Sequence, residues 1–314
     1  MKKLLDYIFF LRPALFPPVW TIVILGARAA DVREGGSPIT SLGFSAIPTD
    51  LVLLLLFSTL LYGGVYTLNQ VFDIESDKQN KKLFFLAEGM ISVKSAIVLT
   101  VILDLVAVIG AFTLGLWVGL LFSFIVVLGI LYSHPRTNFK GQPSHGYWSN
   151  AVGHGIVPFM IGWAAFGDIG LEAALKAVPY MFGVGAIYLN TTLPDRDGDR
   201  AVGKITHGVR WGIKKTMQAS VFLVVLSIIT AQMAGDFAYL LASLISLPFF
   251  VMAAAASKKE AMPRIILSTK IAIIVLSLSA SIYLPYYLAV LIIGFNLSRV
   301  YYKSRFGLDY PSIR

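Results

Sequence analysis

Long apolar stretches alternate with short polar connections along almost the whole chain. Each stretch is close to the roughly 20 residues that a helix needs to cross a bilayer. The last one, residues 265–302, predicts either one span plus a surface helix or two spans broken near Pro285. We therefore expect an all-α integral membrane protein with nine or ten transmembrane helices, forming one domain over residues 1–314. The other candidate spans are 10–30, 51–72, 92–112, 114–134, 149–168, 171–193, 216–233 and 237–256.

The composition excludes a water-soluble globule. Hydrophobic residues make up 57% of the chain and charged residues only 14%, with a mean hydropathy of +0.75. A soluble domain is nearer to half apolar and a quarter charged, so this chain has too little polar surface to face water on all sides. The chain has no cysteine, which excludes disulfides, thiolate metal sites and cysteine nucleophiles.

Lysines and arginines gather in alternate connections. The connections after the second, fourth, sixth and eighth spans are rich in them, as is the N-terminus, whereas the opposite connections are short and poor in cations. Because this bias sets the orientation of membrane proteins, we expect a protein of the cell membrane whose lysine- and arginine-rich side faces the cytoplasm. The net charge of +9 then reflects topology, and nucleic acid is not an expected partner.

The first chemical motif lies where the second span enters a cytoplasmic connection. It reads Asn69-Gln-Val-Phe-Asp73-Ile-Glu-Ser-Asp77. Residues four apart share one helix face, so the side chains of Asn69, Asp73 and Asp77 form one acceptor-rich stripe. Two acids so placed are costly near a membrane unless a cation sits between them. Oxygen ligands alone indicate magnesium or calcium, and magnesium is usually held by one or two carboxylates plus substrate phosphates. The alternative is a solvated helix end.

The second motif, Asp195-Arg-Asp197-Gly-Asp199-Arg200, lies at the cytoplasmic end of the sixth span. Asp195 and Asp199 repeat the spacing of the first motif if the segment is helical, although Pro194 and Gly198 leave a local break open. Two acidic clusters at one membrane face, in a chain with only 17 acids, favour a joint metal–phosphate site over a charged loop.

Cations accompany both clusters, and a diphosphate needs such neutralisation in addition to metal ions. For each of them the alternative role is to set the topology. Arg12 differs because it lies at the edge of the first span, where an arginine either serves function or extends to the interface. The other cations near the motifs are Lys81, Lys82, Arg136, Lys140, Lys204 and Arg210.

Polar and aromatic residues elsewhere in the spans are less specific. His145 and His154 have no matching ligand set, so a zinc site is not expected. Asn150 and Asn190 suit hydrogen bonds between helices or the lining of a cavity. Several aromatic residues could line a cavity for a polyene tail, although packing at the interface is the simpler interpretation. They are Tyr62, Tyr66, Phe84, Phe85, Trp148, Tyr188 and Phe295.

These motifs together resemble those of the UbiA superfamily of intramembrane prenyltransferases. Asn69-x-x-x-Asp73-x-x-x-Asp77 resembles the first family signature. Asp195-x-x-x-Asp199, followed by Gly203-Lys204-x-Thr206, looks like the second. The similarities stand in the family's order over residues 10–210, and the ordered set is far more specific than one DxxxD. The further similarities are Arg12-Pro13, Asn80-Lys81 with Gly89, and Tyr132-Ser133-x-Pro135.

The resemblance implies nine helices around a central cavity and an active site on the cytoplasmic side. It implies Mg²⁺-dependent transfer of a polyprenyl chain from its diphosphate to a lipophilic, aromatic-type acceptor, both reaching the site from the membrane lipid. Asp73, Asp77, Asp195 and Asp199 would hold the metal, and Asn69 would complete that site. The residues that would bind the diphosphate are Arg12, Lys81, Lys82, Tyr132, Arg136, Lys140 and Lys204.

One departure from the family pattern follows the first motif. Many members have Arg-Pro where this chain has Phe84-Phe85, and the run Leu86-Ala87-x-Gly89 is nearer to homogentisate-type members. Lys81 or Lys82 would then replace the missing arginine.

Two alternative functions stay open. One is a UbiA-type terpene cyclase, in which the allylic cation attacks its own chain. The other is a transporter, which would more often place its charges near the midplane of broken helices. In this chain the acids lie at span ends.

Overall fold

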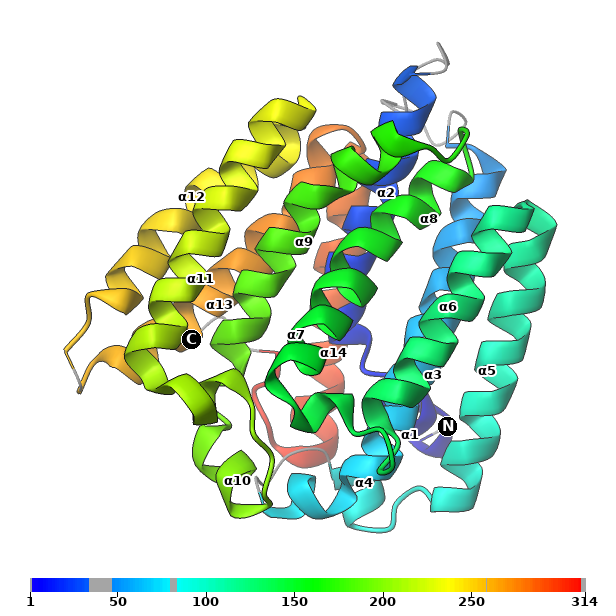
Figure 1. Ribbon diagram of the computed structural model, residues 1–314. Helices are drawn as coiled ribbons and strands as arrows, with labels where there is room; N and C mark the ends of the chain where they lie inside the picture. Colours follow the sequence, from blue (N-terminus) through cyan, green and yellow to red (C-terminus); the bar gives the residue numbers. More distant parts are fainter. Residues whose placement is uncertain (1, 34–46, 80–83, 258, 312–314) are drawn as a thin grey trace.

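The structure is a computed structural model that describes residues 2–33, 47–79, 84–257 and 259–311. Every regular element in these ranges is a helix, as predicted (Figure 1). The α-helices are α1 (Lys2–Phe10), α2 (Phe16–Arg33), α3 (Thr49–Gln79), α4 (Phe84–Ala87), α5 (Val93–Leu114), α6 (Leu116–Ser133), α7 (Pro143–Asn150), α8 (Val157–Ala164), α9 (Leu171–Thr191), α10 (Arg196–Ala201), α11 (His207–Ala234), α12 (Phe237–Ala254), α13 (Ala261–Ser279) and α14 (Pro285–Phe306). Short 3₁₀ turns form η1 (Pro13–Leu15), η3 (Phe139–Gly141) and η5 (Ala280–Ile282), and η4 (Ala151–Ile156) is π-helical.

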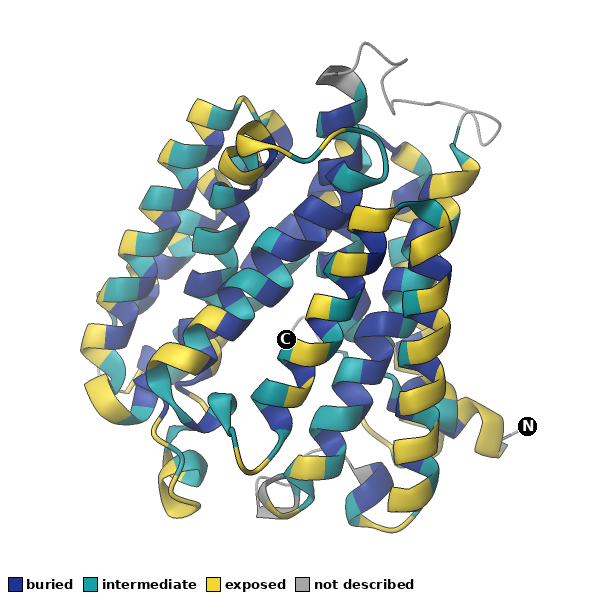
Figure 2. Ribbon diagram, turned by 45° about the vertical axis from the view of Figure 1, so that its right-hand side comes forward, coloured by how far each residue is buried: buried dark blue, intermediate teal, exposed yellow. Residues whose placement is uncertain are grey.

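Seven helical segments in the described ranges are long and apolar enough to cross a membrane. They include α3, α5, α6, α11, α12 and the α1–α2 and α13–η5 stretches. The spans predicted at 149–168 and 171–193 are helical but fall outside this set, so a total of nine or ten crossings stays a prediction. On α5 the apolar side chains of Ile102, Leu105 and Ile109 are more than half exposed. Exposed positions recur along the outer helices of the bundle (Figure 2). Such a surface suits lipid, and the protein is a multi-pass membrane protein.

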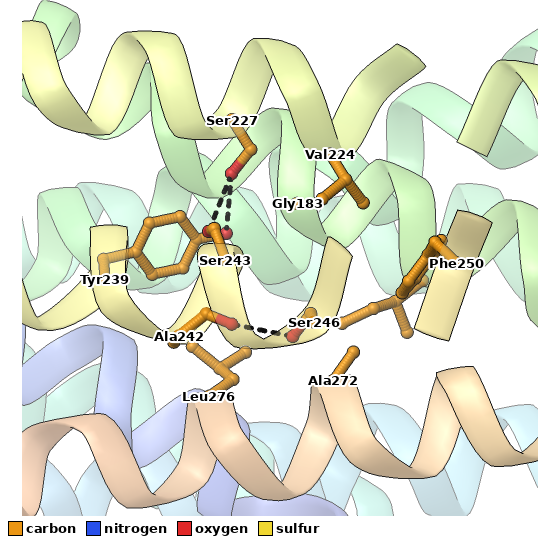
Figure 3. Close-up of a pocket in the computed structure, with 11 residues that line it drawn as sticks. Gly183, Val224, Ser227, Tyr239, Ala242, Ser243, Ser246, Phe250, Ala272 and Leu276 are labelled. Atoms are coloured by element: carbon orange, nitrogen blue, oxygen red, sulfur yellow. Dashed lines mark hydrogen bonds between the residues drawn. The ribbon is translucent and has the colours of Figure 1, made fainter. Parts of the chain in front are cut away.

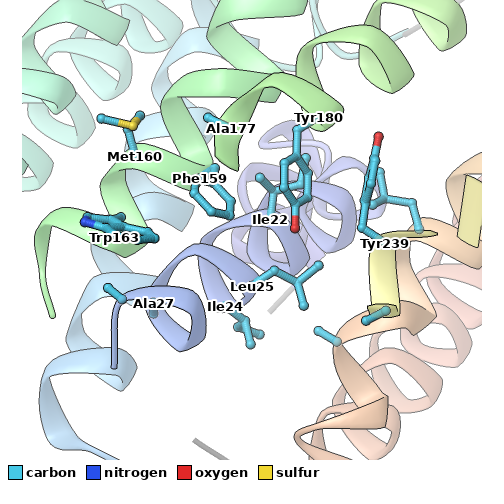
Figure 4. Close-up of a cluster of buried hydrophobic side chains, with 14 of the residues drawn as sticks. Ile22, Ile24, Leu25, Ala27, Phe159, Met160, Trp163, Ala177, Tyr180 and Tyr239 are labelled. Carbon is cyan, nitrogen blue, oxygen red and sulfur yellow. The ribbon is translucent and has the colours of Figure 1, made fainter. Parts of the chain in front are cut away.

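The largest buried cluster lies where α2 crosses α8 and α9 (Figure 4). Glycines set the close approach of α2 and α8: a Cβ at Gly26 would collide with the carbonyl oxygen of Phe159, and one at Gly162 with that of Val23. Small residues allow membrane helices to pack backbone against backbone. The chain α7–η4–α8 is thereby fixed in the middle of the bundle, between α2 and α9.

The polar connections predicted to share a face gather at one end of the bundle, named here the α10 end (Figure 1). The backbone N–H of Ile205, after α10, donates to the carbonyl of Gly141, before α7, at 3.0 Å. Leu193 and Met217 share a buried cluster with Ala261, which joins this region to the start of α13. Which side of a membrane this end faces stays a prediction.

The last apolar stretch is broken near Pro285. Its first part, α13 with η5, is among the candidate membrane spans and α14 is not, so the choice between a second span and a surface helix stays a prediction. The helix α13 ends at Ser279, and α14 starts at Pro285 and returns to α1 at the α10 end. Tyr301 donates a 2.6 Å hydrogen bond to Asp6, and Arg305 contacts both oxygens of the same carboxylate at 3.1 and 3.2 Å. This group, the Asp6 clasp, ties the first helix to the last described helix.

Candidate active site

The first acidic motif lies on one continuous helix. Because α3 runs unbroken from Thr49 to Gln79, Asn69, Asp73 and Asp77 do share a helix face. The side-chain amide of Asn69 donates to Ser133 Oγ at 3.4 Å, at the C-terminal end of α6. The motif therefore lies where α3 and α6 meet at the α10 end.

The second acidic motif forms the short helix α10, which settles the local break left open by the sequence. Asp195 occupies its N-cap, and the Asp199 N–H donates to the Asp195 carbonyl at 2.8 Å, so the two acids have helical spacing. The segment then turns at Gly203, whose φ of 75° favours glycine. Beyond the turn, Thr206 Oγ1 donates to Asp199 Oδ2 at 3.3 Å.

Three segments that are distant in the sequence meet at Asp73. Lys140 Nζ lies 2.8 Å and Lys204 Nζ 3.1 Å from the same oxygen, Asp73 Oδ1. The three side chains are only 10–19% exposed. Lys204 reaches Asp73 through the turn at Gly203, and Lys140 through η3, which starts after Asn138 in a left-handed conformation with φ of 44°. The structure thus brings together both acidic motifs' segments and the loop between them.

The electrostatics of this cluster are mixed. Burial lowers the pKa of Lys140, and the neighbouring Asp73 carboxylate opposes that shift. Asp77 also acts on Lys140. Carboxylates and ammonium groups therefore alternate in a partly buried site, where a bound anion and its counter-cations find partners of both signs.

Tyr132 connects the cluster to the interior of the bundle. Its side chain forms a hydrogen bond with Asn150 on α7 and lies within electrostatic range of Asp73 and Asp199. Tyr188 on α9 is within range of Tyr132 and Asp199. Asn150 therefore makes the contact between helices that was one of its two predicted roles. A polar residue in an apolar span was the available signal, although it did not identify the partner.

Other predicted diphosphate ligands stand outside this cluster. Arg136 is exposed, and within the described ranges the structure records no ion pair for it. The backbone of Arg12 has a left-handed conformation, with φ of 61°, at the junction of α1 and η1. It lies within electrostatic range of Tyr66 and Tyr302.

Lys81 and Lys82, the predicted replacements for the missing family arginine, lie outside the described residues. Phe85, at the position of the departure, is 1% exposed and packs edge-on against Phe10 and Phe306. Phe85 therefore belongs to the apolar cluster that α4 forms with α1 and α14.

The donor atoms of the acidic motifs are of the type that Mg²⁺ prefers. Among the described residues no three acidic or histidine side chains approach closely enough to hold one ion by themselves. Magnesium, however, is usually held by one or two carboxylates with substrate phosphates as the other ligands. Asp73 with Asp77, and Asp195 with Asp199, supply one such pair each, so the residues fit the ion together with a diphosphate.

Two hollows lie away from the acidic motifs. One of about 30 Å³ lies between α9, α11, α12 and α13, where Ser227, Tyr239 and Ser243 exchange hydrogen bonds (Figure 3). Another of about 150 Å³ is lined by Arg28, Lys176 and other residues at the opposite end. Neither includes an acidic-motif residue, so the candidate site is defined by the contacts around Asp73.

Comparison with known proteins gives concordant results. The model of the UbiA prenyltransferase family matches residues 36–265. A digeranylgeranylglyceryl phosphate synthase from Methanococcoides burtonii is 30% identical over 72% of this chain and 77% of its own length. A 2-acyl-4-prenylphloroglucinol 6-prenyltransferase from Humulus lupulus is 29% identical over 65% of this chain and 51% of its own. The structure of a UbiA homologue from Archaeoglobus fulgidus bound to GPP and Mg²⁺ has the same fold, with a TM-score of 0.62 and 18% identity over 88% of this chain and 99% of its own.

Proposed function

The chain belongs to the UbiA prenyltransferase family, and on that premise we propose that it transfers a polyprenyl group from its diphosphate to a lipophilic acceptor, with Mg²⁺ as cofactor. It is a prenyltransferase with several membrane-spanning helices. The observation that carries the proposal is the meeting of Lys140 and Lys204 at Asp73, because it joins both acidic motifs' segments in one partly buried site. That site supports a diphosphate better than a transported ion alone.

The chain's own residues have distinct tasks in this proposal. Lys140 and Lys204 neutralise oxygens of the diphosphate as the allylic C–O bond breaks, with charge-assisted hydrogen bonds. Thr206 orients Asp199, and Asn69 orients the end of α3. Mg²⁺, held by the four aspartates of the two motifs, would supply Lewis-acid stabilisation of the leaving group.

The acceptor is the second substrate of the proposed reaction. We take an aromatic ring as the first candidate, supported by the similarity to the Humulus lupulus phloroglucinol prenyltransferase. A glycerol-phosphate ether lipid is the second candidate, supported by the similarity to the archaeal synthase. In both cases the acceptor is lipophilic and would enter from the membrane.

The location and orientation of the enzyme are a further part of the proposal. We propose a single domain over residues 1–314 in the cell membrane, with the α10 end facing the cytoplasm. The excess of lysine and arginine in the connections at this end supports that orientation.

Purified protein in detergent tests the proposal directly. With Mg²⁺, geranylgeranyl diphosphate and either an aromatic or a glycerol-phosphate acceptor, we expect diphosphate release and one prenylated product by mass spectrometry. A cyclic hydrocarbon formed without acceptor would instead support the terpene cyclase. No metal-dependent diphosphate release from any of several chain lengths would refute the proposed function.

A further inference from the structure

His154 occupies an unusual place in the middle of the bundle. It lies in η4, a π-helical segment inserted between α7 and α8. Its ring stacks on Tyr66 of α3, with centroids 6.0 Å apart and planes 8° apart, and packs against Tyr62 at 5.4 Å. Single turns of π-helix are rare and occur frequently at functional sites.

One ring nitrogen of this imidazole is buried without a partner. Its Nδ1 is buried without a hydrogen bond. An unsatisfied buried polar group costs about 1–3 kcal/mol. Most such groups in proteins are paired, and an exception calls for a reason such as catalysis or a missing ligand. A phenylalanine would make the same aromatic contacts without that cost.

The backbone around His154 fixes the ring in place. Tyr62 donates from its hydroxyl to the carbonyl of Gly153 at 2.6 Å, so α3 is bonded to the residue preceding the histidine. On the other side, a Cβ at Gly155 would lie 2.7 Å from the carbonyl oxygen of Tyr180 on α9. The backbone on both sides of His154 is therefore held between α3 and α9.

The position of His154 relative to the acids is defined by two elements. On α3, Tyr66 precedes Asp73 by seven residues, which is about 10 Å along a helix. On the α7–η4 segment, Asn150 precedes His154 by four residues and bonds with Tyr132, which lies within electrostatic range of Asp73 and Asp199. His154 is thus one to two turns deeper in the bundle than the acidic motifs.

We propose that His154 contacts the acceptor and takes up the proton that prenyl transfer releases. The assignment rests on the proposed function and identifies a residue that serves the acceptor half of that reaction. The nucleophilic oxygen or ring carbon of the acceptor bonds to the allylic carbon, whose C–O bond electrons leave with the diphosphate. The proton of the acceptor passes to a ring nitrogen of His154. The alternative is a purely structural role, in which His154 only packs against Tyr62 and Tyr66.

Two variants separate these roles. His154→Phe keeps the ring contacts and removes both nitrogens, and His154→Gln keeps hydrogen bonding without a group that takes up a proton. His145→Phe is the matched control, because His145 is exposed and its ring packs against Phe139, outside the acidic motifs. Each protein is assayed for Mg²⁺-dependent diphosphate release without acceptor and for prenylation of the acceptor found for the wild type.

We expect both His154 variants to lose about 10²- to 10⁴-fold in prenylation, the usual contribution of a general base, while acceptor-free diphosphate release stays within about twofold. The His145 control should retain both activities. Prenylation within about threefold of wild type in the Phe variant overturns the proposal, and so does an equal loss of both activities in both variants. Wild-type protein that releases no diphosphate when Mg²⁺, the prenyl diphosphate and either acceptor are all present refutes the proposed function itself.

Discussion

Replacement of Lys140 by methionine should change metal binding and donor binding in opposite directions. Lys140 and Lys204 contact the oxygen of Asp73 that is proposed to hold Mg²⁺, so in the absence of substrate the lysines and the metal compete for it. When the diphosphate is present, the same lysines have its oxygens as partners. Lys140→Met removes one competitor of the metal and one ligand of the donor, with little change in side-chain volume.

The size of the expected change in Mg²⁺ affinity follows from the burial of the Lys140–Asp73 ion pair. Exposed ion pairs are worth roughly 0–1 kcal/mol, and breaking a fully buried pair costs roughly 3–5 kcal/mol. Lys140 and Asp73 are 10% and 15% exposed, and Lys204 still neutralises Asp73 in the variant. We therefore expect the binding free energy of Mg²⁺ in the absence of donor to improve by about 1.4 kcal/mol, which is roughly tenfold tighter binding. Loss of one hydrogen bond between charged groups, about 1.5–3 kcal/mol, should raise the donor KM about 10- to 100-fold.

Isothermal titration with Mg²⁺ and steady-state kinetics with the prenyl diphosphate measure the two effects. Lys176→Met is the matched control: its amine bonds to the carbonyl of Ala234 at the opposite end, and neither constant should change. Weaker Mg²⁺ binding in Lys140→Met would refute the competition, because the lysine would then support the metal site. An unchanged donor KM would refute its role as a diphosphate ligand.

Three further predictions concern the acids, the undescribed lysines and the topology. Asp199→Ala should lower turnover at least 10²-fold at unchanged melting temperature, since contacts with a leaving-group charge are worth that much; near-normal activity in Mg²⁺ would remove the second motif from the site. Lys81→Ala or Lys82→Ala should raise the donor KM and leave the acceptor KM unchanged, because one of them replaces the family arginine; an unchanged donor KM in both would leave these lysines a role in topology alone. Ser144→Cys and Ser257→Cys should each react with an impermeant thiol reagent only from the cytoplasmic side, as measured in oriented membranes; labelling of either one only from outside would overturn the orientation.

The sequence predicts those parts of the site that depend on local periodicity. Asn69, Asp73 and Asp77 share a face because a four-residue spacing has that meaning on any helix, and α3 is continuous there. The break near Pro285 is similarly local, because proline removes a backbone donor and favours the first turn of a new helix. The helical class follows from apolar length alone.

Contacts between distant segments were not predictable in this way. Lys204 and Asp73 are 131 positions apart, and their contact depends on how α10 and its turn pack beside α3. From the sequence, Arg136 and Lys140 were equal candidates, yet only Lys140 contacts an acid in the described structure. The π-helical turn at His154 has no compositional signature, although a histidine between Gly153 and Gly155 within an apolar span was a signal that could have been weighed.

The Asp6 clasp has a consequence for the biosynthesis of the protein. Asp6 and Arg305 are 299 positions apart, so the carboxylate leaves the ribosome long before the guanidinium that binds it. During that interval α1 has none of its partners from α14, and the apolar face that Phe9 presents to Tyr301 stays uncovered. Closure of the α10 end is therefore a late step, after insertion of the intervening helices. A chain terminated before Tyr301 would carry every residue of both acidic motifs and still present an open end to proteases during its assembly in the membrane.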